Sequence, residues 1–141
     1  MHNATEELLG EIYIGARSGC EAIGAILPRV TDAALLQNTT AQMEMYCVLS
    51  QKAEQMLSGK QFPCPSFPLA SRLVVRGGVI LETMDSSTQT ELAQILRRAA
   101  SDGAERMRAA VHALQGDADP DALALAQRMV GFEENLGGTF G

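Results

Sequence analysis

The stretch QFPCPSFP, residues 61–68, decides how the rest of this chain can fold. Its prolines, Pro63, Pro65 and Pro68, lack the backbone N–H that a helix needs, so the segment predicts an extended loop. On both sides of the loop, apolar residues recur every three or four positions, which is the spacing of one buried helix face. The loop therefore separates two helical halves of the chain.

The first half predicts two antiparallel helices. The first covers about residues 4–26, and Asn3 and Glu6 have the spacing of a capping box at its start. A proline ends this helix, and Thr31 is the expected N-cap of a second helix that runs to about residue 58. Because the turn between them is short, we expect the two helices to pack as antiparallel neighbours.

The second half predicts one short helix and two long ones, over about residues 68–84, 88–114 and 120–136. Thr88 and Glu91 repeat the capping-box spacing, and Asp119-Pro120 places an N-cap residue before a proline at the first helical position. Four long amphipathic helices with one crossover form a bundle. The predicted fold class is all-α, an up-down four-helix bundle with a short crossover helix between the second and third long helices, in one domain over residues 1–141.

Charge and hydropathy exclude several kinds of partner. Eleven basic and seventeen acidic residues give a formal net charge of −6, whereas nucleic-acid backbones are bound by clustered Lys and Arg. The longest apolar stretch, residues 73–81, is interrupted by Arg76 and is too short to span a bilayer. The acidic N-terminus, MHNATEELLG, does not resemble a signal peptide. We therefore expect a cytoplasmic protein with no nucleic-acid or membrane partner.

The layout of two helical hairpins linked by a crossover helix resembles the ferritin-like superfamily, and in particular its small bacterial members. The resemblance covers nearly the whole chain. Metal-binding members of that superfamily place a Glu on each of two helices and a Glu-x-x-His on each of the other two. The carboxylates that match here are Glu11, Glu44 and Glu133, while Cys47 and Leu136 stand where the resemblance implies histidines.

Two functions follow from this degenerate pattern. In the favoured one, the ancestral di-metal site is lost, so the protein has no catalytic residue, metal or cofactor and acts through protein contacts. In the alternative, Glu11, Glu44, Cys47 and Glu133 bind iron or manganese in a divergent carboxylate-rich site. Glu44 lies on the polar face of its helix and Glu11 at the edge of its apolar seam, which favours the first.

The three cysteines suggest a third function, a thiol-based redox sensor. A tight turn near Pro28 sets Cys20 level with residue 37, so Cys47 lies about 10 residues, or ~15 Å, farther along and too far for a disulfide. Cys20 and Cys47 are therefore expected to be small core or boundary residues. Cys64, between two prolines, is the thiol expected to be exposed and the candidate sensor.

His112 suggests a further alternative. The run VHALQG, residues 111–116, is similar to the His-x-Leu-Lys-Gly run of histidine phosphotransfer domains, which are also small four-helix bundles. Gln115 replaces the lysine, and residues 117–120 end the helix where those domains continue it. We therefore expect His112 to lie near a helix C-terminus, where the helix dipole favours a cation.

The crossover helix carries more apolar surface than one narrow seam can bury. Its apolar side chains are Leu73, Val74, Val75, Val79 and Ile80. They either cover the open end of the bundle or contact another chain, and two-fold dimers are the commonest closed assemblies. We therefore expect a homodimer or another homo-oligomer.

Overall fold

The computed structural model describes residues 3–83 and 88–139, and this part of the chain contains helices and no β-strand. The prediction of an all-α fold is confirmed. The helices are α1 (Ala4–Ile26), α2 (Ala33–Gly59), α3 (Leu69–Thr83), α4 (Gln89–Leu114) and α5 (Pro120–Thr139), with a 3-10 turn at Leu27–Arg29. The predicted end of the crossover helix at residue 84 lies outside the described residues. Within the described ranges, no helix is long and apolar enough to cross a membrane.

Side-chain caps set the starts of the first two helices. Asn3 caps α1, since its side chain accepts a hydrogen bond from Glu6 N at 3.0 Å. For α2 the predicted cap is wrong: Asp32, not Thr31, accepts a hydrogen bond from Leu35 N at 2.8 Å. A 3-10 turn follows α1 before the chain changes direction. Helix α2 therefore begins at Ala33, one residue later than predicted.

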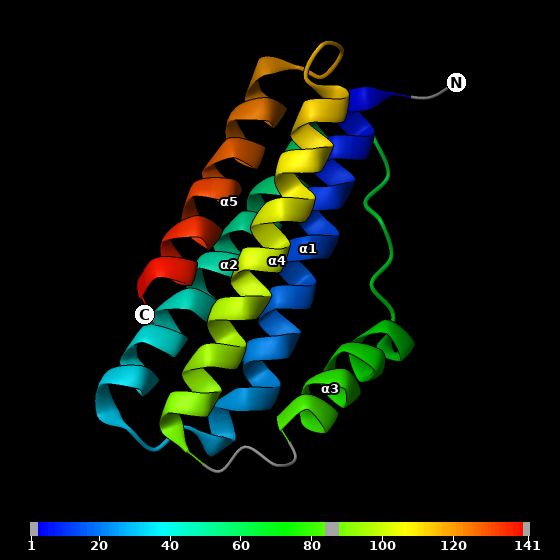
Figure 1. The fold of residues 1–141 in the computed structure, drawn as a ribbon. Coiled ribbons are helices and arrows are strands. Elements are labelled where there is room, and N and C mark those ends of the chain that lie inside the picture. Colours follow the sequence, from blue (N-terminus) through cyan, green and yellow to red (C-terminus); the bar gives the residue numbers. More distant parts are fainter. Residues whose placement is uncertain (1–2, 84–87, 140–141) are drawn as a thin grey trace.

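The four long helices lie side by side as two antiparallel hairpins, α1 with α2 and α4 with α5 (Figure 1). Helix α1 also contacts α4 and α5, and α2 contacts α5. The extended residues 62–68 run back beside α1 to α3, so α2 and α4 point in the same direction (Figure 1). Helix α3 packs against the side of α1 rather than across an end of the hairpins.

The core between these helices consists mainly of aliphatic and small side chains. Fully buried examples come from four helices: Leu8, Leu9, Ile12, Ile26, Leu49, Leu57, Leu92 and Met129. Burying a side chain of this size contributes about 1.5–3 kcal/mol relative to leaving it in water. Packing of this kind, more than helix propensity, stabilises helices in a folded domain.

A glycine allows α1 and α2 to approach each other closely. A Cβ built at Gly19 would lie 2.7 Å from the ring of Tyr46, and that ring is buried. The ring of Tyr46 also packs edge-on against Phe132 of α5, with 5.0 Å between the ring centroids. Tyr46 therefore has little room to move away from α1.

Gly19→Ala should lower the free energy of unfolding by about 1–2 kcal/mol. Overpacking a core costs about 1–3 kcal/mol, while alanine in place of a helical glycine returns up to about 1 kcal/mol. Gly131→Ala on α5 is the matched control, because no described atom lies within 4 Å of a Cβ built there, and it should raise stability. Urea unfolding measures both variants, and equal effects would contradict the close contact at Gly19.

Candidate functional site

Helix α3 is held against α1 by its charged side chains. Arg72 Nε donates to Glu21 Oε1 at 2.7 Å, and Arg76 Nε donates to Glu21 Oε2 at 2.6 Å. Glu21 is buried, which opposes its ionisation, but the hydrogen bonds from Arg76 and Arg72 outweigh burial and lower the pKa of the carboxyl. One buried carboxylate thus anchors two arginines of the crossover helix.

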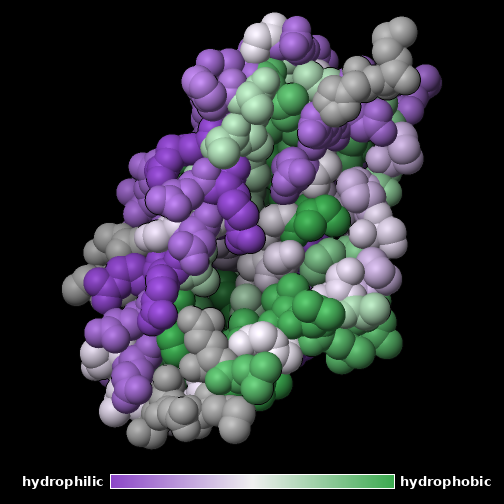
Figure 2. Space-filling model, turned by 45° about the vertical axis from the view of Figure 1, so that its right-hand side comes forward, coloured by the Kyte–Doolittle hydropathy of each residue, from purple (hydrophilic) through white to green (hydrophobic). Residues whose placement is uncertain are grey.

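Because the arginines face α1, the apolar side of α3 faces outward. Five side chains, here called the α3 outer face, are 55–75% exposed: Leu69, Leu73, Val74, Ile80 and Leu81. Figure 2 shows the hydrophobic patch on the lower part of the face that carries α3. Together these side chains expose on the order of 600 Å² of apolar surface, which is at the upper end of the range of areas found for the largest apolar patch on a typical monomer. Exposed apolar patches of this size often coincide with interaction sites in other proteins.

A second candidate site surrounds a buried carboxyl group. Glu133 of α5 is only 3% exposed, and its Oε2 accepts a hydrogen bond from Tyr46 Oη at 2.8 Å. Its Oε1 is also buried and has no hydrogen-bond partner among the described residues. Gly103 of α4 makes this position possible, because a Cβ there would overlap the Glu133 carboxylate. Burial raises the pKa of Glu133 to about 7, although the hydrogen bond from Tyr46 and the charge of Arg106 oppose the rise.

A cavity of about 150 Å³ adjoins this carboxyl group between α1, α4 and α5. Two of the predicted metal ligands, Glu11 and Glu133, line it, together with the cationic side chain of Arg106. Glu11 and Glu133 are 122 positions apart in the sequence, and the structure places both at one cavity. The metal hypothesis requires this proximity of the two carboxylates.

The remaining predicted ligands do not join this cavity. Glu44 is exposed on α2, and Cys47 Sγ lies 3.1 Å from Cys20 Sγ. The Arg106 guanidinium opposes the binding of a divalent cation beside Glu133. In the described part of the chain, no three His, Cys, Asp or Glu side chains are grouped closely enough to hold a metal ion. The residues present do not fit an iron or manganese centre.

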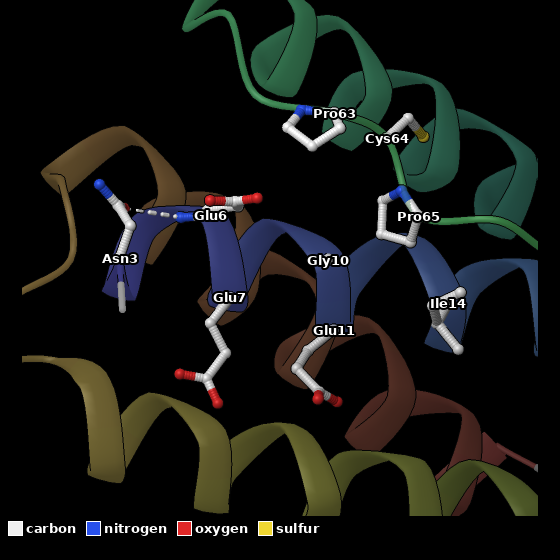
Figure 3. A pocket seen from close by; sticks show the side chains of 9 residues that line it. All are labelled: Asn3, Glu6, Glu7, Gly10, Glu11, Ile14, Pro63, Cys64 and Pro65. Atoms are coloured by element: carbon white, nitrogen blue, oxygen red, sulfur yellow. Dashed lines mark hydrogen bonds between the residues drawn. The ribbon is translucent and has the colours of Figure 1, made fainter. Parts of the chain in front are cut away.

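Cys64 is exposed in a loop, as predicted, and the structure places this loop beside the first turns of α1. Figure 3 shows the loop on one side of a groove and α1 on the other, with Glu7 and Glu11 directed away from the thiol. Partial burial raises the pKa of Cys64, although a hydrogen bond with Tyr13 acts in the opposite direction. This environment favours the protonated thiol, which is a poor nucleophile.

The expected separation of Cys20 and Cys47 is wrong, since their sulfur atoms lie 3.1 Å apart. The expectation assumed that the chain reverses tightly at Pro28. Instead the chain continues beyond α1 through a 3-10 turn, and α2 begins farther out than the end of α1. Cys20 is therefore level with Cys47 rather than with residue 37.

His112 is exposed in the last turn of α4, the position expected for it. Leu136, which stands where the resemblance implies a histidine, is buried in the core.

Two features were missed from the sequence, the Glu21–arginine anchor and the Tyr46–Glu133 bond. The pair Arg72 and Arg76, spaced by four on a largely apolar helix, could have indicated a buried anionic partner. No such signal joins Tyr46 to Glu133, which are 87 positions apart.

The chain was compared with protein-family models, with curated proteins and with solved structures, and none of them matched.

Proposed function

We propose that this protein is a ferritin-like bundle that has lost its metal site and acts through protein contacts, first of all by forming a homodimer through the α3 outer face. The observation that carries the proposal is the orientation of α3, which directs Arg72 and Arg76 toward Glu21 and leaves its apolar side in water. The two antiparallel hairpins and the long crossover support the ferritin-like part of the proposal.

A second copy of the chain suits the α3 outer face better than a charged partner does. In a two-fold dimer the same surface meets itself, so a face made of apolar side chains leaves no charge unpaired. Ala70 and Gly77 fall between the large apolar residues on the helical wheel, and no described atom lies within 4 Å of a Cβ built at Gly77. Two α3 helices can therefore approach closely along this line.

The size of the face supports the same partner. Each subunit of a standard-size interface buries about 800 Å², of which the α3 outer face alone supplies on the order of 600 Å². The flanking side chains of the crossover can supply the rest as a polar rim.

A double substitution of the two most exposed residues, Val74→Lys and Leu81→Lys, should convert the dimer into a folded monomer. These side chains are 75% and 71% exposed, so lysine costs little in the single chain. In the dimer each lysine occurs twice, and its ammonium group is removed from water without gaining an anionic partner. The dissociation constant of the dimer should therefore rise at least about tenfold. Sedimentation velocity over a concentration series measures it, and circular dichroism checks that the helices remain.

Leu36→Lys is the matched control for this experiment. Leu36 is an exposed apolar residue of α2, outside the α3 outer face, so this variant should stay dimeric. A monomeric wild-type protein, or a double variant that dimerises like the wild type, would rule out pairing through α3.

The loss of the metal site has a separate test. Elemental analysis of the purified protein should find no stoichiometric iron or manganese, because Arg106 shares the cavity with Glu133. Iron or manganese near one equivalent per chain, lost on Glu133→Ala, would overturn this part of the proposal and leave the dimer question unaffected.

A further inference from the structure

Two thiols meet between α1 and α2. Cys20 Sγ and Cys47 Sγ are 3.1 Å apart, and Cys20 Sγ also lies 3.7 Å from the backbone oxygen of Met43. Both cysteines are free, and both residues are partly exposed. Their approach is only about 1 Å longer than the ~2 Å bond of a disulfide.

The surrounding helices hold the two thiols in place. Gly19 and Tyr46, each one residue before a cysteine, are in contact because glycine has no Cβ to separate them. Tyr46 is fixed in turn by its hydrogen bond to Glu133 and by Phe132. The pairing of Cys20 with Cys47 is therefore set by the packing of three helices and not by the conformation of a loop.

We propose that Cys20 and Cys47 form a modification site, at which a low-molecular-weight disulfide such as oxidised glutathione converts the two thiols into a reversible cross-link between α1 and α2. This site differs from the thiol sensor that the sequence suggested, because the exposed Cys64 takes no part in it.

The reaction proceeds by two thiol–disulfide exchanges. Cys47 loses its proton and attacks one sulfur of oxidised glutathione, which breaks that S–S bond, releases one glutathione and leaves a mixed disulfide on Cys47. Cys20 then loses its proton, and its thiolate attacks Cys47 Sγ and expels the second glutathione. The protein gives up two protons and two electrons, and oxidised glutathione takes them up to become two reduced molecules.

The order of the two steps follows from the surroundings of Cys20. Burial, together with the hydrogen bond and charge of Cys47, raises the pKa of Cys20 to about 12. Cys20 is therefore a poor first nucleophile, because the thiolate and not the thiol attacks a disulfide. Once Cys47 is bound in the mixed disulfide, it no longer raises the pKa of Cys20, so Cys20 can ionise more readily and act as the resolving thiol.

The experiment uses the full chain with Cys64→Ser, which removes the competing thiol. The protein is equilibrated with oxidised glutathione in excess, and free thiols are then blocked with N-ethylmaleimide under denaturing conditions. The expected product has lost both alkylation sites and is lighter than the reduced chain by two hydrogen atoms. Trypsin should release residues 18–29 and 30–52 as one disulfide-linked pair, since these peptides contain Cys20 and Cys47.

A second variant, Cys20→Ser with Cys64→Ser, tests the roles of the two thiols. It should stop at a glutathione adduct on Cys47 and should not gain thermal stability. The cross-linked protein, in contrast, should melt at a higher temperature than its reduced form, because the bond restricts the unfolded chain. Two alkylated cysteines after equilibration, or a stable adduct in the Cys64→Ser protein without the cross-link, would overturn the proposal.

Discussion

The free energy of unfolding should fall as the pH rises from about 5 to about 8, and Glu133→Gln should remove most of that fall. Burial raises the pKa of Glu133 from its usual 4.5 to about 7 in the folded protein. Between these two values the folded state binds a proton that the unfolded state has released. Stability from this group is therefore complete below about pH 4.5 and is lost as the pH passes 7.

The expected size of this effect is large for one residue. A shift of the Glu133 pKa from 4.5 to about 7 corresponds to about 3 kcal/mol, at roughly 1.4 kcal/mol for each pH unit. Tyr46, which donates a hydrogen bond to Glu133, does not titrate in this range, because burial above all raises its pKa above its usual value. The pKa of Glu21 is lowered in the folded protein, so its contribution to the free energy of unfolding is lost only as the pH falls below this range.

Urea unfolding at a series of pH values measures this dependence. Glu11→Gln is the matched control, because Glu11 lines the same cavity but is exposed, and it should leave the pH profile unchanged. If the free energy of unfolding of Glu133→Gln fell between pH 5 and 8 as steeply as that of the wild type, the buried carboxyl would not be the group that titrates.

Removing the anchor of α3 should have an effect of similar size. Glu21→Ala deletes the buried carboxylate that binds Arg72 and Arg76, and breaking a buried ion pair typically costs about 3–5 kcal/mol. Because the two arginine side chains are 44% and 40% exposed and can return to water, we expect a loss of about 2–3 kcal/mol. Trypsin should also cleave after Arg72 and Arg76 faster, since α3 has lost its attachment to α1.

Glu134→Ala is the control for this prediction. Glu134 pairs with Arg108, and both side chains are 49% exposed, so the loss should stay below about 1 kcal/mol. Denaturant unfolding and limited proteolysis of the two variants give the comparison. Similar losses from the buried and the exposed pair would show that Glu21 does not hold α3 in place.

Local signals in the sequence predicted the helices well, because caps and prolines act within a few residues. The bounds of α1 follow from Asn3 and Pro28, and the loop before α3 follows from its prolines. The predicted N-cap of α2, Thr31, is one residue too early, because Thr and Asp both cap helices and only the path of the preceding turn decides between these neighbours.

Contacts between distant residues could not be predicted in the same way. The register of α1 against α2 depends on how far the chain continues before it reverses, and this distance brings Cys20 to Cys47. Helix α3 also departs from the usual rule that the apolar side of an amphipathic helix faces the core. Its direction is decided by Glu21, a residue of another helix that no local pattern connects to Arg72 or Arg76.

Helix α1 is about 35 Å long, and each of the other described α-helices contacts it. Helix α3 is attached to α1 at Glu21, which is one residue from Cys20. Gly15 and Ser18, also in α1, line the cavity beside Glu133. One helix thus links the α3 outer face, the pair of thiols and the cavity beside the buried acid.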